Sequence, residues 1–355
     1  MSRQRQRIRF LRTADGVQIA WAEVGSGAPL VKASNWLTHL EYEWGSPVWR
    51  HWLDFLSDNF RFIRYDERGC GLTDHVVPDG TIETWVDDLE AVIDAAQPSV
   101  PVILLGISQG AAACIAYSIR DPERVSKMIL YGAYARGYYH RLTPDQEREY
   151  RVIIEAMRVG WGKKNPAFRQ LFTSRFIPEG TPEQVEWFNE LCRETTTADI
   201  AAELLEIRAR VNVSDLLDKV RVPTLVVHGR RDHIIPLSEG RLLATAIKGA
   251  EFVELDSSNH VLLAHEPAWQ RFKEVVLEFV GTSAASPNDP FRSLSPRERE
   301  ILSLITEGLG NAQIGARLRI SEKTVRNHIS SVYDKLGVWS RAQAMVFARD
   351  HGFRS

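Results

Sequence analysis

The sequence has few cysteines and no long hydrophobic run. Its three cysteines, Cys70, Cys114 and Cys192, are scattered and form no Cys-x-x-Cys pair. They predict neither a disulfide framework nor a zinc site, and they fit a reduced, cytoplasmic protein. The most apolar run, residues 100–107, has the length of a strand and falls short of the ~20 residues that a membrane span needs. The basic first ten residues precede no apolar stretch. We therefore expect no secretory signal, no membrane partner, no bound metal and no cofactor.

Charge is unevenly distributed along the 355 residues, although the net charge is only −2. From Pro290 to the end there are 11 basic and 6 acidic residues, so this segment is basic and the rest of the chain is acidic. A basic end is typical of a nucleic-acid-binding segment, and a chance fluctuation over a short segment explains it equally well.

Composition and pattern divide the chain into two domains. Residues 281–290, GTSAASPNDP, hold no large apolar side chain and predict a linker. In residues 1–280, short apolar runs alternate with helical patterns, which predicts an α/β fold with a mostly parallel sheet covered on both faces. An opening hairpin adds antiparallel strands. Residues 135–211 are helical throughout and rich in aromatics, so they predict a helical lid over the sheet.

The expected strands are residues 7–11, 17–24, 30–33, 60–65, 100–107, 127–131, 224–228 and 251–255. The expected helices outside the lid are residues 49–56, 82–96, 109–120, 238–247 and 266–280.

A candidate nucleophile lies between an expected strand and an expected helix. The residues from Gly106 to Gly110 read Gly-Ile-Ser-Gln-Gly, and G-x-S-x-G in this context predicts a nucleophile elbow that exposes the hydroxyl of Ser108. The glycines are needed because the sharp turn leaves no room for neighbouring Cβ atoms. The backbone N–H of Gln109 then faces the position at which an oxyanion forms.

Asp232 and His260 each follow an expected strand. The chain order Ser, Asp, His, with each residue at the carboxyl end of a parallel strand, is that of a triad in which a neutral histidine takes the serine proton and an aspartate fixes its tautomer. Alone, each has a structural explanation, since an aspartate after a strand often caps a helix and a lone histidine is often a surface group. Together they predict a catalytic triad of Ser108, Asp232 and His260.

With these motifs, the chain from about residue 7 to residue 280 resembles the α/β-hydrolase family. Residues 64–74, RYDERGCGLTD, are similar to the family's D-x-R-G-x-G-x-S loop, with Thr73 in place of the serine. The resemblance implies an α/β-hydrolase fold with a helical lid, and an oxyanion hole completed by the residue after a His-Gly pair.

This sequence departs from the family at the second oxyanion donor. Ser34 and Asn35 stand at the His-Gly positions, so Asn35 and Trp36 become the candidates for this turn, with the Trp36 N–H as donor. The loss of one oxyanion donor costs on the order of 10²–10³ in rate. The triad alone therefore does not decide between an active and an inactive hydrolase site.

Residues 291–355 show three helical patterns. The first begins at a capping box from Ser295 to Glu298, the second follows Asn311, and the third follows Ser321. A tight turn joins the last two, and the third presents Arg, Lys, Asn and Ser on one face, as in a helix-turn-helix domain that contacts phosphates and base edges. A three-helix packing or dimerisation domain with a solvated polar face has the same periodicity.

Residues 294–344 are similar over nearly their whole length to the LuxR-type DNA-binding domain, including the runs ISEKTVRNH and KLGV-x-SR. The resemblance implies four helices, with the third in the major groove and the last, about residues 341–351, in dimerisation. It implies a homodimer on double-stranded DNA that acts with RNA polymerase. By this resemblance Arg326, Asn327 and Ser330 face bases, and Lys323, Thr324 and Lys335 face mostly phosphates.

The two halves together predict a DNA-binding transcriptional regulator whose hydrolase-like domain binds a small apolar or acyl molecule between sheet and lid. Three hypotheses remain. The hydrolase-like domain is a receptor, in which Ser108 and His260 only hydrogen-bond the ligand; or it hydrolyses an ester or lactone signal; or the chain is a metabolic hydrolase with an interaction appendage. Labelling of Ser108 by a fluorophosphonate separates the first two, and sequence-specific DNA binding excludes the third.

Overall fold

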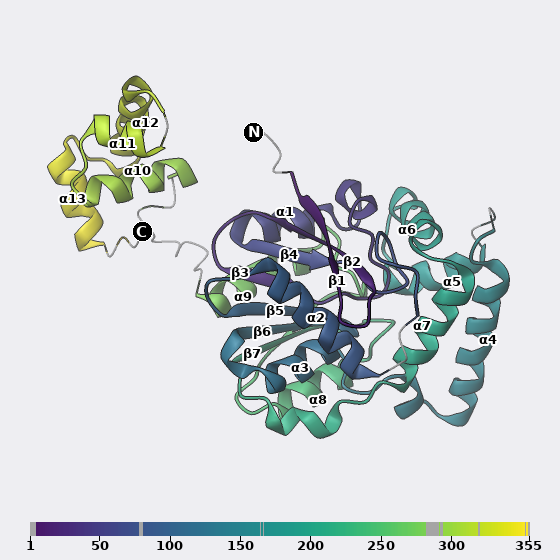
Figure 1. Ribbon diagram of the computed structural model, residues 1–355. Helices are drawn as coiled ribbons and strands as arrows, with labels where there is room; N and C mark the ends of the chain where they lie inside the picture. The colour runs from purple at the N-terminus through teal and green to yellow at the C-terminus, as the bar shows by residue number, and fades with distance from the viewer. Residues whose placement is uncertain are drawn as a thin grey trace. The chain divides into compact units, whose positions relative to one another are not determined.

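The computed structural model describes residues 5–77, 81–163, 165, 167–281, 291, 294–318, 320–351 and 353. The chain divides into two compact units, Met1–Thr282 and Ser283–Ser355, which are drawn in Figure 1. Apart from Gly281, the linker expected at residues 281–290 lies outside the described residues. Within the described part of the chain, no helix is both long and apolar enough to span a bilayer.

The first unit is built on one eight-stranded sheet with the order β1-β2-β4-β3-β5-β6-β7-β8. The first two strands pair antiparallel with each other, β2 also pairs antiparallel with β4, and all other pairs are parallel. The α/β-hydrolase fold expected from the sequence is therefore confirmed. The strands are β1 Arg7–Arg12, β2 Gln18–Val24, β3 Pro29–Lys32, β4 Arg61–Tyr65, β5 Val102–Ile107, β6 Val125–Tyr131, β7 Thr224–Gly229 and β8 Glu251–Leu255.

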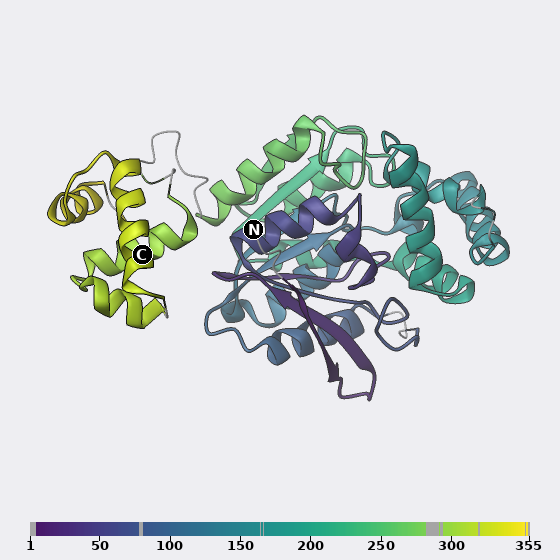
Figure 2. The ribbon, with the colours of Figure 1, turned by 90° about the horizontal axis from the view of Figure 1, so that it is seen from above.

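Helices cover both faces of this sheet. In Figures 1 and 2, α2, α3 and α8 lie on one face, while α1 and α9 lie on the other. The second face is packed with aromatic rings, since the ring of Trp52 on α1 lies 4.8 Å from Trp269 and 4.6 Å from Phe272 on α9. These helices are α1 Arg50–Asn59, α2 Ile82–Ala96, α3 Gly110–Arg120, α8 Leu237–Ala246 and α9 Pro267–Val280.

The boundaries differ from the expected ones by few residues. The clearest difference is β5, which begins at Val102 rather than at residue 100. Pro101 has no N–H to donate to a neighbouring strand, and Val100 before it is 53% exposed. The apolar run therefore continues beyond the paired strand.

In the described part of the chain, four α-helices are inserted between β6 and β7 and form the lid, which lies at the right in Figures 1 and 2. They are α4 Pro144–Gly160, α5 Ala167–Phe176, α6 Pro182–Thr195 and α7 Ala198–Arg210. Capping boxes at Thr143 and Thr181, each followed by proline, fix the starts of α4 and α6. The two ends of the insertion lie together, because Gly137 N–H donates to Val211 O at 2.7 Å.

The second unit contains four helices in its described residues, α10 Pro296–Thr306, α11 Asn311–Leu318, α12 Glu322–Leu336 and α13 Arg341–Asp350. Ile301, Ile314, Val325 and Ile329 are buried between the first three helices. The turn between α11 and α12 requires a glycine, because a Cβ at Gly315 would lie 2.9 Å from the carbonyl oxygen of Ile320.

Candidate functional site

The sheet register brings four positions to one edge. The last residues of β5 and β6 pair as Ile107 and Tyr131, and β6 continues the register into β7. Carboxyl ends of parallel strands meet at the same edge, where α/β folds place ligands. Ser108 follows β5 directly and Gly132 follows β6, while Asp232 and His260 lie in the loops after β7 and β8.

Ser108 has the backbone of a nucleophile elbow. Its φ is +54°, a left-handed conformation that a non-glycine residue rarely adopts, and it is 8% exposed. The flanking glycines allow this turn: a Cβ at Gly106 would lie 2.6 Å from Cα of Ala111, and one at Gly110 would lie 2.8 Å from the carbonyl oxygen of Ser34. The backbone of β5, α3 and the turn after β3 therefore approach closely around Ser108.

Asp232 and His260 form a buried pair. His260 Nδ1 lies 2.6 Å from Asp232 Oδ2, and the other carboxylate oxygen accepts the backbone N–H groups of Ile234 and Ile235. Burial raises the pKa of Asp232, but the attraction of His260 and these hydrogen bonds outweigh burial and hold the pKa below its ordinary value. The aspartate stays ionised and fixes the imidazole, whose Nε2 has no hydrogen-bond partner in the described chain.

Gly132 makes room for this pair. Its φ is +53°, and a Cβ there would lie 3.1 Å from Cε1 of His260 and 3.6 Å from Oδ2 of Asp232. Sequence reasoning did not single out this glycine. Its position directly after an expected strand, at the edge that carries the triad, is the signal that identifies it.

The two expected oxyanion donors lie beside Ser108. Trp36 and Gln109 are buried and line the same cavity as the serine. Neither backbone N–H donates a hydrogen bond within the described residues. Asn35 differs: its side chain accepts from the ammonium of Lys32 and donates to the carbonyl oxygen of Trp36. Asn35 thus supports the turn and is not among the residues that line the cavity.

Lys32 is an unexpected buried cation below this turn. Burial lowers the pKa of its ammonium to about 8, against the attraction of Glu43. Nothing in one sequence distinguishes this lysine from a surface lysine at a strand end, because the three residues before it in β3 are apolar and give no sign of polar neighbours.

The lid closes a cavity above Ser108. The cavity measures about 40 Å³. Its floor is formed by Ser108, Gln109 and Trp36. Its roof is largely aromatic, and Tyr138 stacks on Tyr150 with ring centres 4.4 Å apart. The lid residues that line it are Tyr138, Tyr150, Phe172, Arg175, Phe176, Leu205 and Arg208.

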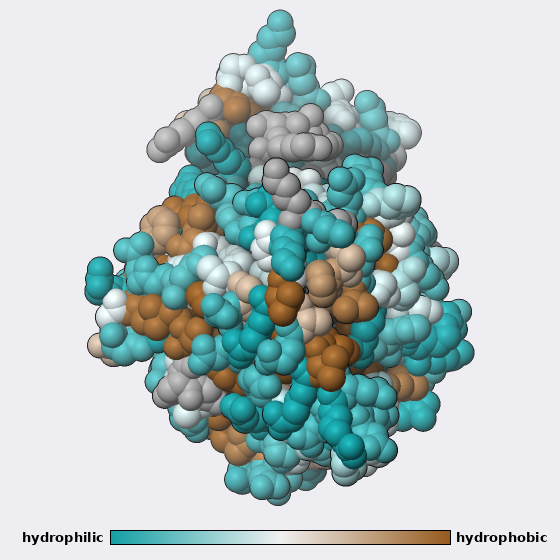
Figure 3. All heavy atoms as spheres, turned by 90° about the vertical axis from the view of Figure 1, so that its right-hand side faces the viewer, coloured by the Kyte–Doolittle hydropathy of each residue, from teal (hydrophilic) through white to brown (hydrophobic). Residues whose placement is uncertain are grey.

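The outer surface of the lid carries exposed hydrophobic side chains. Figure 3 views the side of the first unit on which the lid lies and shows hydrophobic patches among hydrophilic residues. Val152 and Val159 on α4 and Leu171 on α5 are about half exposed or more. These side chains face away from the cavity and are not part of its lining.

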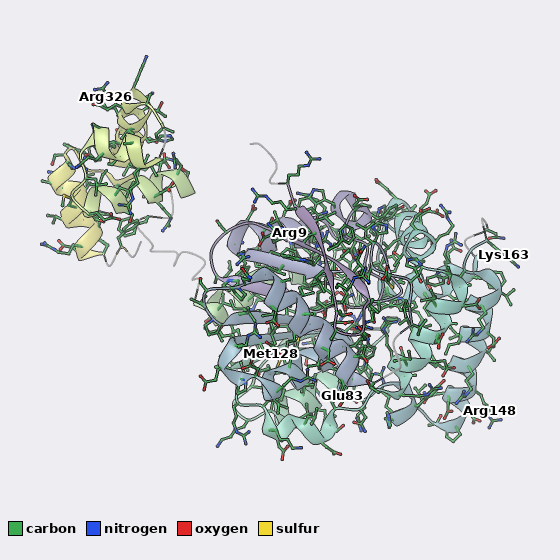
Figure 4. All side chains as sticks on the ribbon, in the orientation of Figure 1. Arg9, Glu83, Met128, Arg148, Lys163 and Arg326 are labelled. Atoms are coloured by element: carbon green, nitrogen blue, oxygen red, sulfur yellow. The ribbon has the colours of Figure 1, made fainter. Side chains whose placement is uncertain are left out.

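In the second unit, the expected DNA-facing residues lie on α12. Lys323, Asn327 and Ser330 are exposed. Arg326 is exposed as well, and it points away from its unit in Figure 4. Among the described residues its one ion pair, with Glu322, is an exposed contact of 3.3 Å. Thr324 is half-buried and its hydroxyl lies 2.8 Å from that of Ser321, within the helix cap.

Lys335 has a contact that the sequence did not predict. Its ammonium lies 2.7 Å from Glu298 Oε2, the acid of the capping box that begins α10. Burial raises the pKa of Glu298, but hydrogen bonds from Lys335, Ser331 and Ser295 outweigh burial and lower it to about 2. The ion pair links α12 to the first turn of α10. Contact of Lys335 with phosphate stays a prediction.

Comparisons with known proteins agree with this division. Residues 51–268 match the family model for serine aminopeptidase, S33. The chain belongs to this family. Residues 292–348 match the model for bacterial regulatory proteins, luxR family. The protein is therefore an S33-family α/β-hydrolase domain joined to a C-terminal LuxR-family helix-turn-helix domain. The sequence predicted the α/β-hydrolase and the LuxR-type domain, and the S33 family is added by the comparison.

Individual relatives of this S33–LuxR protein match one of its two domains. The AB hydrolase superfamily protein YisY of Bacillus subtilis is 27% identical over 71% of this chain and 91% of its own length. The probable HTH-type transcriptional regulator GfsR of Streptomyces halstedii is 45% identical over 18% of this chain and 27% of its own. A solved esterase from Exiguobacterium antarcticum has a TM-score of 0.64 at 24% identity, covering 77% of this chain and 98% of its own, and shows the fold alone.

Proposed function

We propose that this protein is a one-component transcriptional regulator. A small molecule binds in the cavity above Ser108, and its presence changes how the LuxR-type domain binds double-stranded DNA. The observation that carries the proposal is the lidded cavity at the carboxyl edge of the sheet, in a chain that also carries a DNA-binding domain. A sensory cavity and an output domain in one chain need no separate signalling partner.

The size of the cavity supports a coupled movement. Sites for ordinary small ligands measure about 300 Å³ or more, whereas this cavity measures about 40 Å³. A ligand therefore has to displace lid side chains or lid helices when it enters. Coupling between two sites requires that a ligand favour one arrangement of the protein over another, and a cavity that must open meets this requirement.

The LuxR-type domain supports the remaining parts of the proposal. The protein acts in the cytoplasm, on the chromosome and together with RNA polymerase. It acts as a homodimer, whose two-fold symmetry matches a pseudo-palindromic DNA site. The last helix, α13, carries the half-exposed Val346, and the residue Trp339 before it is 76% exposed. Both fit a surface that a second copy covers.

The test is DNA binding by the full chain. DNA is selected from a random-sequence pool, and its Kd is measured with and without small acyl and aromatic compounds that raise the Tm of the protein. The proposal expects selection of a consensus sequence, and it expects at least one such compound to change the Kd. A chain that selects no consensus from the pool is a metabolic hydrolase with an appendage.

A second function is favoured by the geometry of the triad. Ser108 Oγ attacks the carbonyl carbon of an ester or lactone while Nε2 of His260 takes its proton and then gives it to the leaving oxygen. The alcohol leaves and the acyl group stays on Ser108 Oγ as an ester. Water then attacks the carbonyl of this ester while Nε2 takes a proton from the water, and Nε2 passes the proton to Ser108 Oγ as the bond to the acyl group breaks and the acid is released. The Asp232–His260 pair and the two backbone donors support this reaction. Within the described residues Nε2 of His260 makes no hydrogen bond to Ser108, so the hydroxyl and the imidazole have to approach each other when the substrate binds. In this case the protein also destroys, or produces, its own signal.

A fluorophosphonate probe tests this second function, because it reacts with an activated serine. Labelling of the wild type, and none of Ser108→Ala, supports hydrolysis. No labelling of the wild type leaves a receptor in which Ser108 and His260 only bind the ligand. Either result is compatible with regulated DNA binding, so the two functions are tested separately.

A further inference from the structure

Arg208 on α7 has buried hydrogen-bond donors without acceptors. The residue is 5% exposed. One amino group, Nη2, pairs with the carboxylate of Glu67, while Nε and Nη1 have no partner in the described chain. Buried donors are nearly always paired, because an unpaired one has lost its water without replacement. An acceptor that the described chain does not supply is therefore expected at this guanidinium.

The position of Arg208 indicates where that acceptor lies. Its guanidinium lies over the ring of Trp36, 4.6 Å from the ring centre, and the side chain lines the cavity together with Ser108. A molecule that fills the cavity contacts the side chain of Arg208, so a small rotation of the guanidinium brings its buried donors to that molecule. The missing acceptor thus belongs to the ligand of the cavity.

The charges around the cavity favour an anion. No described residue that lines the cavity carries a carboxylate, and three carboxylates of the surrounding loops and helices each already have a partner. These pairs are Glu67 with Arg208, Glu239 with Arg136, and Asp232 with His260.

Two further arginines have no carboxylate partner among the described residues. Arg175 lines the cavity, and its one hydrogen bond, at 3.4 Å, goes to the carbonyl oxygen of His233. Arg141 lies at an adjoining hollow that shares Tyr138 and Arg175 with the cavity. All three guanidinium nitrogens of Arg141 lack partners in the described chain. The approach to the cavity therefore has an excess of positive charge.

We propose that the ligand is a small organic carboxylate with an aromatic or alkyl body. Its carboxylate accepts hydrogen bonds from the unpaired donors of Arg208, and Arg175 supplies the compensating charge. The body lies against Tyr138, Phe172 and Phe176. Hydrogen bonds between a guanidinium and a carboxylate are among the stronger ones in proteins. This inference rests on the proposed sensory function and names the chemical class of its ligand.

Matched pairs of probes test the inference on the full chain. 4-Phenylbutyrate is compared with 4-phenylbutyramide, and hexanoate with hexanamide, by titration of tryptophan fluorescence, since Trp36 lies below Arg208. The carboxylate of at least one pair is expected to bind about tenfold or more tightly than its amide. Arg208→Gln and Arg175→Gln are each expected to weaken carboxylate binding by about tenfold and to leave amide binding unchanged.

Arg148→Gln is the matched control. Arg148 lies on the lid helix α4, is 78% exposed and points to solvent in Figure 4, so its loss is expected to change nothing. Should Arg208→Gln fail to fold because Glu67 stays buried without its partner, Arg175→Gln decides.

Two results overturn the carboxylate assignment. The first is an amide that binds as tightly as its acid, and the second is no binding of either member of the pairs. Neither result contradicts the sensory function, because the DNA-binding test uses compounds of any chemical class. That function is contradicted when the chain selects no consensus DNA, or when no stabilising compound changes the Kd.

Discussion

The guanidinium of Arg208 lies over the indole ring of Trp36, 4.6 Å from its centre. Arg208 belongs to the lid helix α7, and Trp36 belongs to the turn after β3 and lines the cavity beside Ser108. The same arginine pairs with Glu67, which follows β4. One lid side chain thus contacts the cavity, the turn and the loop beyond β4. Displacement of Arg208 by a ligand changes the contacts of all three.

Gly132→Ala is expected to destabilise the first unit. The new methyl group has to adopt a φ of +53° and lies 3.1 Å from Cε1 of His260. A left-handed conformation alone costs about 1–2 kcal/mol for a non-glycine residue, and the contact adds to this cost. The drop in Tm is measured by thermal unfolding.

Gly249→Ala separates the two contributions to the Gly132 result. Gly249 has a φ of +77°, and nothing lies within 4 Å of a Cβ there. This variant has the conformational cost without the contact. Equal Tm values for Gly132→Ala and Gly249→Ala would show that the absence of a side chain at residue 132 is not needed to accommodate the Asp232–His260 pair.

Asp232→Asn is expected to slow fluorophosphonate labelling of Ser108 by about 10²–10⁴. An amide presents no negative charge to Nδ1 of His260 and no longer selects the tautomer whose Nε2 accepts a proton. The labelling rate is followed by mass spectrometry of the intact chain. Asp256→Asn, at an exposed carboxylate that pairs with Arg231, is the control. Equal rates for both variants would contradict the assigned role of Asp232.

The sequence predicted the elements that local patterns specify. The order of strands and helices, the elbow around Ser108 and the capping box at Ser295 all follow from residue types at fixed spacings. The same spacings identify families, which is why both domains were recognised from one sequence. The pairing of Asp232 with His260 was accessible because parallel strands bring their carboxyl ends to one edge.

Contacts between distant segments were not accessible. Arg208 is one of several arginines on lid helices, and only the packing of α7 against the turn at Trp36 gives it a buried position. Lys32 is likewise a single polar residue after an apolar run. The pairing of Lys335 with Glu298 depends on how α12 crosses α10, which helical periodicity does not specify. These residues owe their roles to tertiary packing, on which a local pattern carries no information.

Arg326→Ala is expected to weaken binding to the selected DNA by about 1–3 kcal/mol and to relax preference at one base position. The guanidinium is 62% exposed on α12 and is free to leave its weak contact with Glu322. Kd values are measured across a panel of single-base variants of the DNA. Arg349→Ala, at an exposed arginine near the end of α13, is the control. A loss that is equal for all sequences would assign Arg326 to phosphate.

The second unit is expected to lose stability in acid through Glu298. The pKa of this carboxylate is about 2, below its ordinary value of 4.5. A lowered pKa stabilises the folded state above pH 4.5, and this contribution is lost as the pH falls from 4.5 towards 2. Glu298→Gln is expected to remove it at all pH values and to flatten the dependence.

Protection of α10 and α12 against hydrogen exchange, corrected for the intrinsic exchange rate, measures this effect at pH 6 and pH 3. Glu300→Gln is the control, because Glu300 lies on the same helix and its one ion pair among the described residues, with Arg297, is at the surface. The prediction is contradicted when protection falls from pH 6 to pH 3 no more steeply in the wild type than in Glu298→Gln. The ion pair with Lys335 then contributes nothing to stability.

The most direct test of the account is the affinity of the full chain for its selected DNA, measured by fluorescence anisotropy with and without a compound that raises the Tm of the protein. Coupling between two sites in one protein typically amounts to about 5–150-fold in affinity. We predict a change of at least about fivefold in the Kd, and its loss in Leu205→Trp, because Leu205 lines the cavity and a tryptophan there fills it. Identical Kd values with and without every stabilising compound would contradict the proposal that the hydrolase domain controls the DNA-binding domain.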